Sequence, residues 1–471
     1  MSPRPLTIVT VSSSDSGGGA ERVARELHES YAAAGEDAWL AVGTKRGDDA
    51  NTVRLPNRER RSAWTRAWMT VADALPQRGA GFHVAGALRD VVADPLRWAA
   101  RRRGREDFDF PATSALLALH GRTPDLLHLH NLHGGFFDLR ELPRLTARVP
   151  AILSLHDAWM LSGHCAHSFD CGRWETGCGS CPALWIYPSV PRDATAFNWR
   201  RKRQIFANSQ LHVAVPCAWL ADRVRRSMLM LATRELRVMP YGVNLDVFRP
   251  ADKRAARVEL GLDPSRPVVL VFANALRERT WKDSEAFRGA LERLSGAAAG
   301  AQWIALGEEG PDLHVGAVRL RRVAPEPDDR RFARWYQAAD AYVHPARADT
   351  FPLVVLEALA CGTPVIGTAV GGVPEQIASA SFIGGARDGV GHDAATGAVV
   401  PAGDPHALAA AIEGVLALDP AAHARLSANA ARTAVLKFDR RRHERDYLGW
   451  IHALVAERSG AGASRDIKEG P

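Results

Sequence analysis

The sequence predicts an α/β protein made of two doubly wound parallel sheets in tandem. Three observations support this fold class. The chain has 471 residues, which is too long for one ordinary domain. Short apolar runs alternate with amphipathic helical segments, as strands and helices do in a parallel sheet. This alternation is interrupted and then begins again near the middle of the chain, so that two such domains are expected.

The first series begins with a β-branched run, "LTIVTV", which we interpret as a buried strand. A Gly-rich turn and a helix ending at Gly35 follow it, and "DAWLAVG" is the next strand. Residues 51–110 interrupt the series with clustered arginines and tryptophans, which indicate an inserted, mostly helical surface segment. The series resumes with "DLLHLHN", "AILSLHD" and "LHVAVP", and a Cys-rich loop at 164–182 separates the last two. We assign residues 1–247 to this first domain.

The second series starts with the strand "PVVLVFANA" and continues through the helix "FPLVVLEALACG" and the strand "TPVIGTAVGG". We assign residues 248–435 to this second domain. Residues 436–458 are expected to form a C-terminal helix that packs back on the first domain, and 459–471 a disordered polar tail. Ligands of open α/β sheets bind beyond the carboxyl ends of the strands, so the turns at those ends are the places to search for a site.

The composition limits the classes of protein to consider. Hydrophobic residues make up 46% of the chain, which is enough for sizeable cores. The formal net charge of +7 permits phosphates, anionic lipids or nucleic acids as partners and does not choose among them. No run approaches the roughly 18 to 20 apolar residues that span a bilayer, and the N-terminus does not resemble a signal peptide. We therefore expect a cytoplasmic protein, where disulfides are uncommon.

Two carboxylates, Asp349 and Glu357, stand eight positions apart around an apolar run. Pro352 suits the first turn of a helix, where its missing N–H is not needed. A helix start attracts phosphate through its free N–H groups and its dipole, and carboxylates accept hydrogen bonds from sugar hydroxyls. The stretch therefore suits a sugar joined to a phosphate. The alternative is that Asp349 caps the helix and Glu357 lies on the surface.

The same stretch resembles the Glu-x7-Glu signature of family 4 retaining glycosyltransferases, which have the GT-B fold. "LEALACGTPVIGTAVGGVPEQI", "GGGAERVARELHES", "PYGVNLDVFRP" and "TGAVVPAGDPHALAAAI" resemble family segments in the same order, over nearly the whole chain. The resemblance implies two Rossmann-like domains facing a central cleft. It also implies that Glu357 binds the nucleotide ribose and Asp349 faces the donor sugar, and it assigns three neighbours to donor binding: Thr350, Phe351 and Leu353. The sequence departs from the family pattern in having Asp as the first acid and Pro352 where glycine is frequent.

A basic turn, "ANALRERTWKDSEAF", follows the first strand of the second series. Arg277 and Lys282 are five positions apart in it, as in the Arg/Lys pair of the family. Two cations can neutralise a departing nucleoside diphosphate, so both are candidate catalytic residues. The alternative is a solvated charged loop, since Glu278 and Arg279 lie there too; spacing favours Arg277 over Arg279.

Three turns of the first series carry further candidates. Gly18 and Gly19 lie in a strand-to-helix turn that lines the donor and acceptor cleft in family members, although such a turn is also compatible with simple flexibility. His156 ends a strand where the family commonly places a catalytic histidine, and Asp157 follows it on the acceptor side. Asn131 ends another strand and is a second acceptor-side candidate. His128 and His130 share one face of that strand and suit a core as well as a site.

Four cysteines lie within a short stretch, "HCAHSFDCGRWETGCGSCP": Cys165, Cys171, Cys178 and Cys181. Thiolates favour tetrahedral zinc, which predicts a small structural zinc site, with His164 and His167 as alternative ligands. Free thiols and two disulfides stay open as alternatives. A Cys-bearing segment after "LHDAW" also resembles a subgroup that builds bacterial exopolysaccharides such as colanic acid.

The patterns together favour a glycosyltransferase that moves a sugar from a nucleoside diphosphate sugar to a hydroxyl of a glycan or a lipid-linked saccharide, with no cofactor required for catalysis. An inactive paralogue that only binds nucleotide sugar and a nucleotide-sugar epimerase are the alternatives. The basic, Trp-bearing segments suit either an anionic membrane surface or an ordinary solvated face. Nucleic acid is suggested only by charge and is not expected as a partner.

Overall fold

The computed structural model describes residues 4–75, 79–119, 121–277, 280–381, 383–384 and 390–466; nothing is said below of the side chains of 79–81 and 459–466. The chain divides into two compact units, and each is described by itself. Unit 1 consists of Met1–Val215, Leu220–Val238 and Asp446–Pro471, and unit 2 of Pro216–Trp219 and Met239–Arg445.

In unit 1, seven described strands form one sheet in the order β3-β2-β1-β4-β5-β6-β7, and every pairing is parallel. The strands are β1 (Thr7–Ser14), β2 (Asp37–Thr44), β3 (Thr52–Arg54), β4 (Leu126–His130), β5 (Ala151–Ser154), β6 (Leu211–Val215) and β7 (Thr233–Val238). The chain leaves β1 toward β2 and returns to β4 on the other side of β1, so the order reverses between β1 and β4. Ligands of doubly wound sheets bind at the carboxyl ends of strands beside such a switch point.

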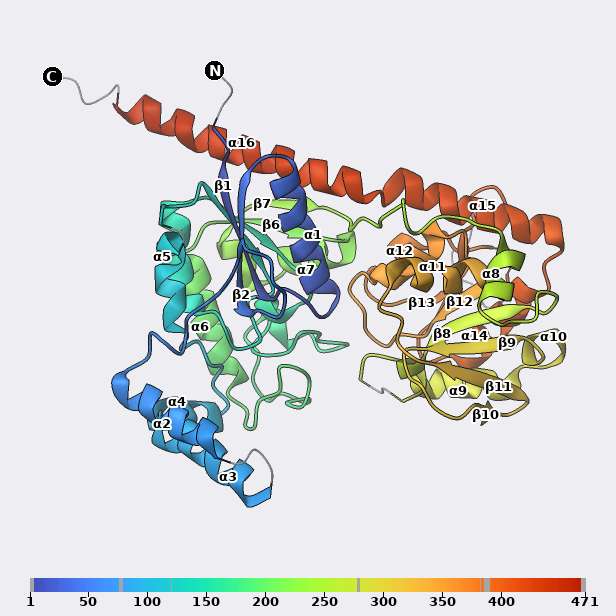
Figure 1. Cartoon of the computed structure of the whole chain (residues 1–471), viewed down its shortest axis with the longest axis horizontal. Coiled ribbons are helices and arrows are strands. Elements are labelled where there is room, and N and C mark those ends of the chain that lie inside the picture. The colour runs from blue at the N-terminus through green and yellow to red at the C-terminus, as the bar shows by residue number, and fades with distance from the viewer. Residues whose placement is uncertain are drawn as a thin grey trace. The chain divides into compact units, whose positions relative to one another are not determined.

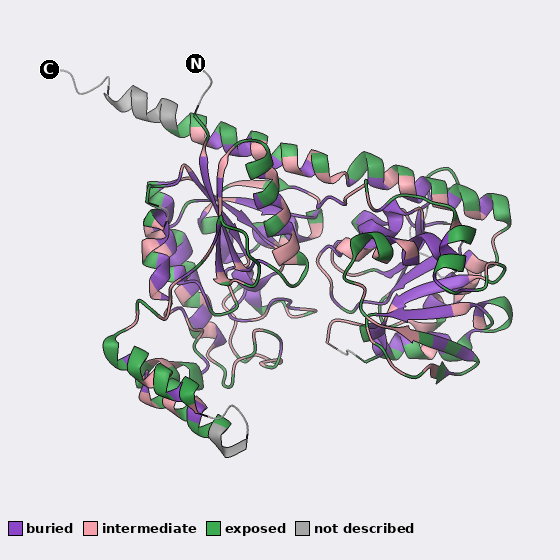
Figure 2. Cartoon of the chain, viewed as in Figure 1, coloured by how far each residue is buried: buried purple, intermediate pink, exposed green. Residues whose placement is uncertain are grey.

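Helices of unit 1 follow the strands, and a separate helical group, α2 to α4, is inserted between β3 and β4 (Figure 1). The helices and short helical turns of this half of the chain are α1 (Gly19–Ala33), α2 (Ala63–Ala74), α3 (Gly79–Ala87), η1 (Leu88–Val92), α4 (Pro95–Arg102), η2 (Pro111–Ala118), η3 (Leu139–Glu141), α5 (Leu142–Arg148), η4 (Trp159–Leu161), η5 (Arg173–Glu175), α6 (Thr195–Ala207), α7 (Ala218–Arg225) and η6 (Met228–Leu231). The central strands are buried, whereas much of the inserted group is exposed (Figure 2).

Unit 2 repeats the doubly wound pattern. Its described strands follow the order β10-β11-β9-β8-β12-β13-β14, and only the edge pair β10 and β11 is antiparallel. The strands are β8 (Val268–Phe272), β9 (Gln302–Leu306), β10 (Leu313–Val315), β11 (Val318–Val323), β12 (Ala341–His344), β13 (Val365–Thr368) and β14 (Gly397–Val400). Its order reverses between β8 and β12. The predicted fold class, α/β with two doubly wound parallel sheets, is confirmed.

The helices of unit 2 cover a large apolar core centred on β8, β9 and β12. They are α8 (Lys253–Glu259), η7 (Ala273–Leu276), α9 (Ser284–Arg293), α10 (Gly296–Ala299), α11 (Asp329–Ala338), α12 (Leu353–Ala360), α13 (Val373–Gln376), α14 (Pro405–Leu416), α15 (Pro420–Lys437) and the start of α16 (Arg440–Asp466).

The observed boundaries differ from the predicted ones at two places. Unit 2 begins at Met239, before the expected residue 248. The reason is packing, because the Tyr241 ring lies 5.7 Å from the ring of Phe351, inside unit 2. Residues 436–445 also belong to unit 2, whereas α16 belongs to unit 1 from Asp446 onward. Part of the tail expected to be disordered is helical, up to Asp466, and residues 467–471 lie outside the described residues.

Among the described helices, none alone is long and apolar enough to cross a membrane. Only α14 and α15 taken together meet a test of length and composition, and they are bent by 109° at their junction.

Candidate active site

Asp349 lies at the centre of a partly buried polar cluster in unit 2. Its Oδ2 atom is 3.3 Å from Nζ of Lys282 and 3.2 Å from Nε2 of His344, and Nδ1 of His344 lies 3.0 Å from the Tyr342 hydroxyl. Burial alone would raise the pKa of Asp349, but Lys282 and His344 lower it to about 2. Asp349 is therefore an ionised hydrogen-bond acceptor at neutral pH. Since α12 has no side-chain cap, the alternative that Asp349 caps this helix is excluded.

The backbone brings these groups together at the carboxyl end of β12, beside the switch point. His344 is the last residue of β12, and an isolated bridge pairs Lys282 with Ala346 in the loop that follows. Gly371, in the loop after β13, packs against the backbone of Asp349 and has a φ of +52°. A Cβ atom at Gly371 would lie 1.8 Å from the carbonyl oxygen of Asp349, so only glycine fits there.

Glu357 is the second acid, and it is buried rather than on the surface. It lies in the second turn of α12, 3% exposed, and its Oε2 accepts a hydrogen bond of 3.3 Å from the Tyr336 hydroxyl. A buried carboxylate requires hydrogen-bond donors, and a tyrosine hydroxyl is one such donor. The alternative of a surface role is therefore wrong. Pro352 is the N-cap of α12, one position before the predicted first turn.

The remaining candidates of unit 2 are placed differently. Arg277 is exposed and pairs with Glu308 rather than with Asp349. Phe351 is buried in the core, and Thr350 contributes its carbonyl oxygen, which accepts from the Gly372 N–H at 2.9 Å. Leu353 opens α12. The competing candidate Arg279 lies outside the described residues, as does its neighbour Glu278.

The Gly-rich turn of unit 1 joins β1 to α1 beside the switch point. Gly18 is the N-cap of α1 and Gly19 is its first residue, and no side chain caps the helix. The turn is shaped by its neighbours, because Ser13 Oγ donates to Glu21 Oε1 at 2.5 Å. The Asp15 carboxylate accepts N–H bonds from Arg46 and Gly47 in the loop after β2. The predicted pair of glycines therefore lies at the carboxyl edge of the sheet.

His156 lies at the end of β5 and stays neutral at physiological pH. Burial lowers its pKa to about 4. Its Nε2 atom lies 2.9 Å from Nδ1 of His130, which ends β4. A neutral imidazole can exchange hydrogen bonds with a substrate but adds no positive charge. Asn131, which follows β4, adopts a φ of +33° and thus turns the chain sharply there.

His133 is the residue of this edge that the sequence reasoning did not select. Its Nε2 atom lies 2.7 Å from Oδ2 of Asp157, and its Nδ1 atom lies 3.4 Å from the Tyr187 hydroxyl. Burial opposes a charged imidazole, but the Asp157 carboxylate outweighs burial and raises the pKa of His133. The two glycines that follow, in "HGGFF", are the one sequence feature that marks this turn as special.

None of the four clustered cysteines is joined to another cysteine in the structure, and neither are Cys217 and Cys361. Disulfides are therefore not formed between them. Burial raises the pKa of the Cys165 thiol to about 11 and that of Cys178 to about 12. In the part of the chain that the structure describes, no three His, Cys, Asp or Glu side chains are grouped to hold a metal ion. Zinc at these cysteines stays a prediction of the sequence.

Comparisons with known proteins show the family to which the chain belongs. A family model described as "Glycosyltransferase Family 4" matches residues 17–247, and another described as "Glycosyl transferases group 1" matches residues 323–433. Together the two models span well over half of the chain. The chain belongs to the family 4 glycosyltransferases. The candidate glycines and histidines of unit 1 fall within the first matched range, and His344, Asp349 and Glu357 of unit 2 fall within the second.

Curated relatives of this family member carry two kinds of name. One is a putative colanic acid biosynthesis glycosyl transferase, WcaC, of Escherichia coli, which is 28% identical over 264 residues, 52% of this chain and 60% of the relative. Another is a D-inositol 3-phosphate glycosyltransferase of Mycolicibacterium paratuberculosis, 36% identical over 243 residues, 48% of this chain and 50% of the relative. The chain spans about a third to three fifths of the length of the curated relatives it matches.

Solved structures of glycosyltransferases share the whole GT-B fold with this family member. A sucrose-phosphate synthase of Thermosynechococcus elongatus matches with a TM-score of 0.59 and 22% identity, over 96% of this chain and 99% of that one. Anabaena Alr3699/HepE in complex with UDP and glucose also matches with a TM-score of 0.59, at 15% identity, over 95% of this chain and 99% of that one. At these identities the likeness establishes the fold.

Proposed function

We propose that this protein transfers a sugar from a nucleoside diphosphate sugar to a hydroxyl acceptor, with retention of anomeric configuration. The cluster of Asp349, Lys282 and His344 in unit 2 is the observation that carries the proposal. An ionised acid beside a lysine, with Glu357 buried on the next helix, combines acceptors for sugar hydroxyls with a cation for phosphate. The UDP-glucose complex of Anabaena HepE, which has this fold, supports a nucleotide-sugar donor.

Each residue has a defined role in this proposal. Glu357 accepts hydrogen bonds from the ribose, and Asp349 does so from the donor sugar. Lys282 stabilises the negative charge that develops on the departing diphosphate, and Arg277 assists once it exchanges Glu308 for the phosphate. In the retaining mechanism of the family, the acceptor attacks on the face that the diphosphate leaves, so no enzyme nucleophile and no cofactor is needed.

On unit 1, neutral His156 and the pair of His133 with Asp157 contact the sugars by hydrogen bonds. The Nδ1 atom of His133 has a long hydrogen bond of 3.4 Å to the Tyr187 hydroxyl, for which a substrate hydroxyl can compete. Gly18 and Gly19 leave the backbone N–H groups at the start of α1 open toward an anionic group.

The acceptor proposed is a glycan or lipid-linked saccharide of cell-surface polysaccharide synthesis. The name of the Escherichia coli relative, WcaC, supports this choice, whereas the name of the mycobacterial relatives favours a phosphorylated cyclitol. Both kinds of acceptor offer a hydroxyl group that the same transfer reaction can use. The specificity of the acceptor site therefore decides between them.

We also propose that the inserted segment rests on an anionic membrane surface. Residues 58–105 hold eleven arginines and four carboxylates, so that their net charge equals the +7 of the whole chain. Trp64, Phe82 and Leu96 on this segment are 59%, 57% and 84% exposed. Exposed apolar side chains among arginines suit the boundary between lipid headgroups and acyl chains.

The experiment that tests the function is nucleoside diphosphate release from a panel of UDP-, GDP- and ADP-sugars, with and without lipid-linked saccharide extracts. Glu357→Gln is the test variant. Tyr336→Phe is its matched control, because it keeps the carboxylate and removes only the hydroxyl that donates to it. Release from one donor, enhanced by an acceptor and lost in Glu357→Gln, is expected. Donor binding without release in any combination would favour the inactive paralogue, and an altered sugar without release would favour an epimerase.

A further inference from the structure

A cavity of about 650 Å³ opens on unit 1, next to the turn that carries His133. Its walls come from α4 and the loop after it, from the turn after β4, and from residues 187–191 beyond the Cys-rich loop. The volume is within the range of pockets that hold small molecules, which is roughly 300 to 1,000 Å³. Neither the family motifs nor the donor chemistry accounts for the arginines on its rim.

The carboxylates that line this cavity are all matched by cations. Asp107 pairs with Arg97 at 2.6 Å, and Glu106 pairs with buried Lys202 at 3.0 Å. The third pair is Asp90 with Arg101, at 3.5 Å. The lining contains two more arginines, so the net charge of the lining together with these partners is positive.

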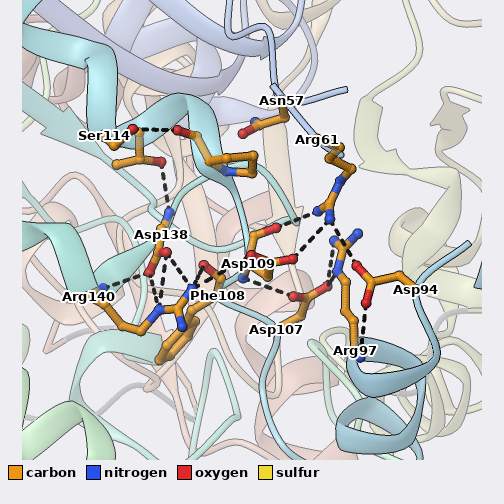
Figure 3. A network of polar contacts seen from close by, with 12 residues as sticks. Asn57, Arg61, Asp94, Arg97, Asp107, Phe108, Asp109, Ser114, Asp138 and Arg140 are labelled. Carbon is orange, nitrogen blue, oxygen red and sulfur yellow. Dashed lines mark hydrogen bonds and ion pairs between the residues drawn. The ribbon is translucent and has the colours of Figure 1, made fainter. Parts of the chain in front are cut away.

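Those two arginines are Arg102 and Arg105, which line the cavity and are exposed. Within the described residues, neither pairs with a carboxylate. Other arginines of the same insertion are held in a dense network instead: Arg61 contacts Asp94 and Asp109 (Figure 3). The contrast shows that paired arginines fix the inserted helices, while the guanidinium groups of Arg102 and Arg105 keep their donors available.

The backbone holds Arg105 in place without using its donors. Gly104 has a φ of +79°, and a Cβ atom there would lie 1.9 Å from the carbonyl oxygen of Arg192, so the turn requires glycine. The guanidinium carbon of Arg105 then lies 4.4 Å from the centre of the Phe197 ring. Stacking on an aromatic ring orients a guanidinium and leaves its in-plane N–H groups free for a phosphate.

The rest of the lining suits the saccharide part of an acceptor. Trp98 is 36% exposed and Tyr187 is 51% exposed, so two amphipathic rings face the opening. Trp159 and His133 lie deeper, with the imidazole 5.4 Å from the indole centre to centre. Aromatic faces with a few polar atoms among them are the usual lining of a pocket that orients a polar ligand.

We propose that this cavity binds the acceptor as a phosphorylated saccharide, with the phosphate held by Arg102 and Arg105 and a hydroxyl directed to His133. This inference rests on the proposed function, because it names the acceptor class of the transfer reaction. Bidentate N–H groups of arginine match phosphate oxygens, which explains why arginine rather than lysine lines the rim. The phosphate can belong to a free sugar phosphate or to a lipid diphosphate carrier.

The test is calorimetric titration of the full chain with inorganic diphosphate and with glucose 1-phosphate. Arg102→Gln with Arg105→Gln is the test variant, and Arg103→Gln is the matched control, an exposed neighbour that does not line the cavity. We expect the double variant to weaken binding of both probes by about tenfold or more, and Arg103→Gln to change it by less than about twofold. Equal losses in both variants, or unchanged binding in the double variant, would overturn the proposal.

Two further titrations separate this inference from the proposed function and identify the source of the phosphate. The nucleoside diphosphates are titrated into the double variant and into Lys282→Gln. If the proposed function fails, nucleotides do not bind, but dependence of glucose 1-phosphate binding on Arg102 and Arg105 can still be measured. Farnesyl diphosphate binding more tightly than inorganic diphosphate indicates a lipid carrier, and equal binding indicates a free sugar phosphate; both sustain the proposal.

Discussion

In unit 2 the charged groups of the candidate site are paired with one another, whereas in unit 1 two arginines on the rim of the cavity have no carboxylate partner within the described residues. Asp349 is held by Lys282 and His344, which lower its pKa to about 2. Arg102 and Arg105 instead surround an open cavity. Paired charged groups are preorganised for one ligand geometry. Arginines without a carboxylate partner suit an anionic group, such as a phosphate, that is attached to different molecules. This difference fits a constant donor and a variable acceptor.

The largest effect should come from breaking the paired cluster of unit 2. Lys282→Met removes the cation beside Asp349, and we expect kcat/KM to fall by about 10²- to 10³-fold, as for loss of one electrostatic contact to a transition state. Arg277→Met should cost less, about tenfold, because Arg277 is exposed and must first leave Glu308. Steady-state kinetics with the donor that the release assay identifies measures both.

The control for these variants is Arg319→Met, which removes another exposed, carboxylate-paired arginine of unit 2, 72% exposed beside Asp312. Its activity should equal that of the wild type. An Arg277→Met defect as large as that of Lys282→Met would mean that the exposed arginine, and not the paired cluster, carries the charge stabilisation.

The buried ion pair of Lys202 with Glu106, beside the cavity of unit 1, should behave as a structural element. Lys202 is completely buried, and its Nζ atom lies 3.6 Å from the centre of the Trp159 ring. Burial lowers the pKa of Lys202 and raises that of Glu106, and the opposite charge of each partner counteracts this effect of burial on the other. Glu106→Ala leaves this lysine unmatched and should lower the free energy of unfolding by about 3 to 5 kcal/mol.

Denaturant unfolding followed by tryptophan fluorescence measures this loss. The double variant Glu106→Leu with Lys202→Met removes both charges and should recover most of the stability, since apolar replacement of a buried pair is often neutral. A single variant that loses less than about 1 kcal/mol would show that water reaches the pair and that it does not brace the cavity wall.

The pairing of His133 with Asp157 predicts a pH dependence that is specific to unit 1. Because the pKa of His133 is raised, protonation blocks its Nδ1 acceptor at a higher pH than for an ordinary histidine. The rate should therefore rise with pH through that raised pKa. Asp157→Asn removes the carboxylate, burial then dominates, and the rising limb should move to lower pH while kcat falls about 10- to 100-fold.

The pH–rate profile of kcat/KM measures this shift, with Glu175→Gln as the control, because Glu175 pairs with Arg226 away from the histidine. A limb that stays in place in Asp157→Asn would show that a different group titrates, and His133 would then be only a packing residue.

Much of the fold and part of the site followed from the sequence, and the reasons can be given residue by residue. Buried parallel strands are continuous apolar runs, and their turns fall at one edge, so Asp349 and His156 could be placed at strand ends, and the resemblance to the family then singled them out as candidates. Lys282 was identified by its five-residue spacing from the preceding arginine of the family pair. In the structure, an isolated bridge pairs Lys282 with Ala346. These features are local in sequence or repeat a known motif.

The remainder depends on contacts that no local pattern records. His133 and Asp157 follow different strands, and they meet because β4 and β5 pair in the register that aligns His130 with Ser154. Arg277 was selected by spacing, but its partner Glu308 lies at the end of another strand. The excess charge at Arg102 and Arg105 appeared only once the partners of the neighbouring arginines were known.

The cysteine prediction concerns whether the Cys-rich loop of unit 1 is held by a metal ion. If the sequence prediction is right, purified protein contains about one zinc per chain by elemental analysis, and Cys178→Ser with Cys181→Ser abolishes it and lowers the melting temperature. Cys217→Ser is the control, since Cys217 is a buried thiol outside the cluster. Fully folded, metal-free wild-type protein would leave the free thiols seen in the structure as the correct description.

The smallest effect concerns the exposed face of the arginine-rich insertion. Phe82→Ser and Leu96→Ser each remove an exposed apolar side chain, and we expect each to weaken flotation with vesicles of anionic lipid by about threefold to tenfold at low salt, since partial burial of one side chain is worth about 1 kcal/mol. Val435→Ser and Leu436→Ser are matched controls, because these side chains are 57% and 66% exposed on α15 of unit 2. Equal losses on both faces would mean that general stickiness, and not the basic insertion, brings the protein to the vesicle. A loss confined to the insertion would extend the contrast between the units, since the same excess of arginine that leaves the cavity positive would also place it beside a lipid-borne phosphate.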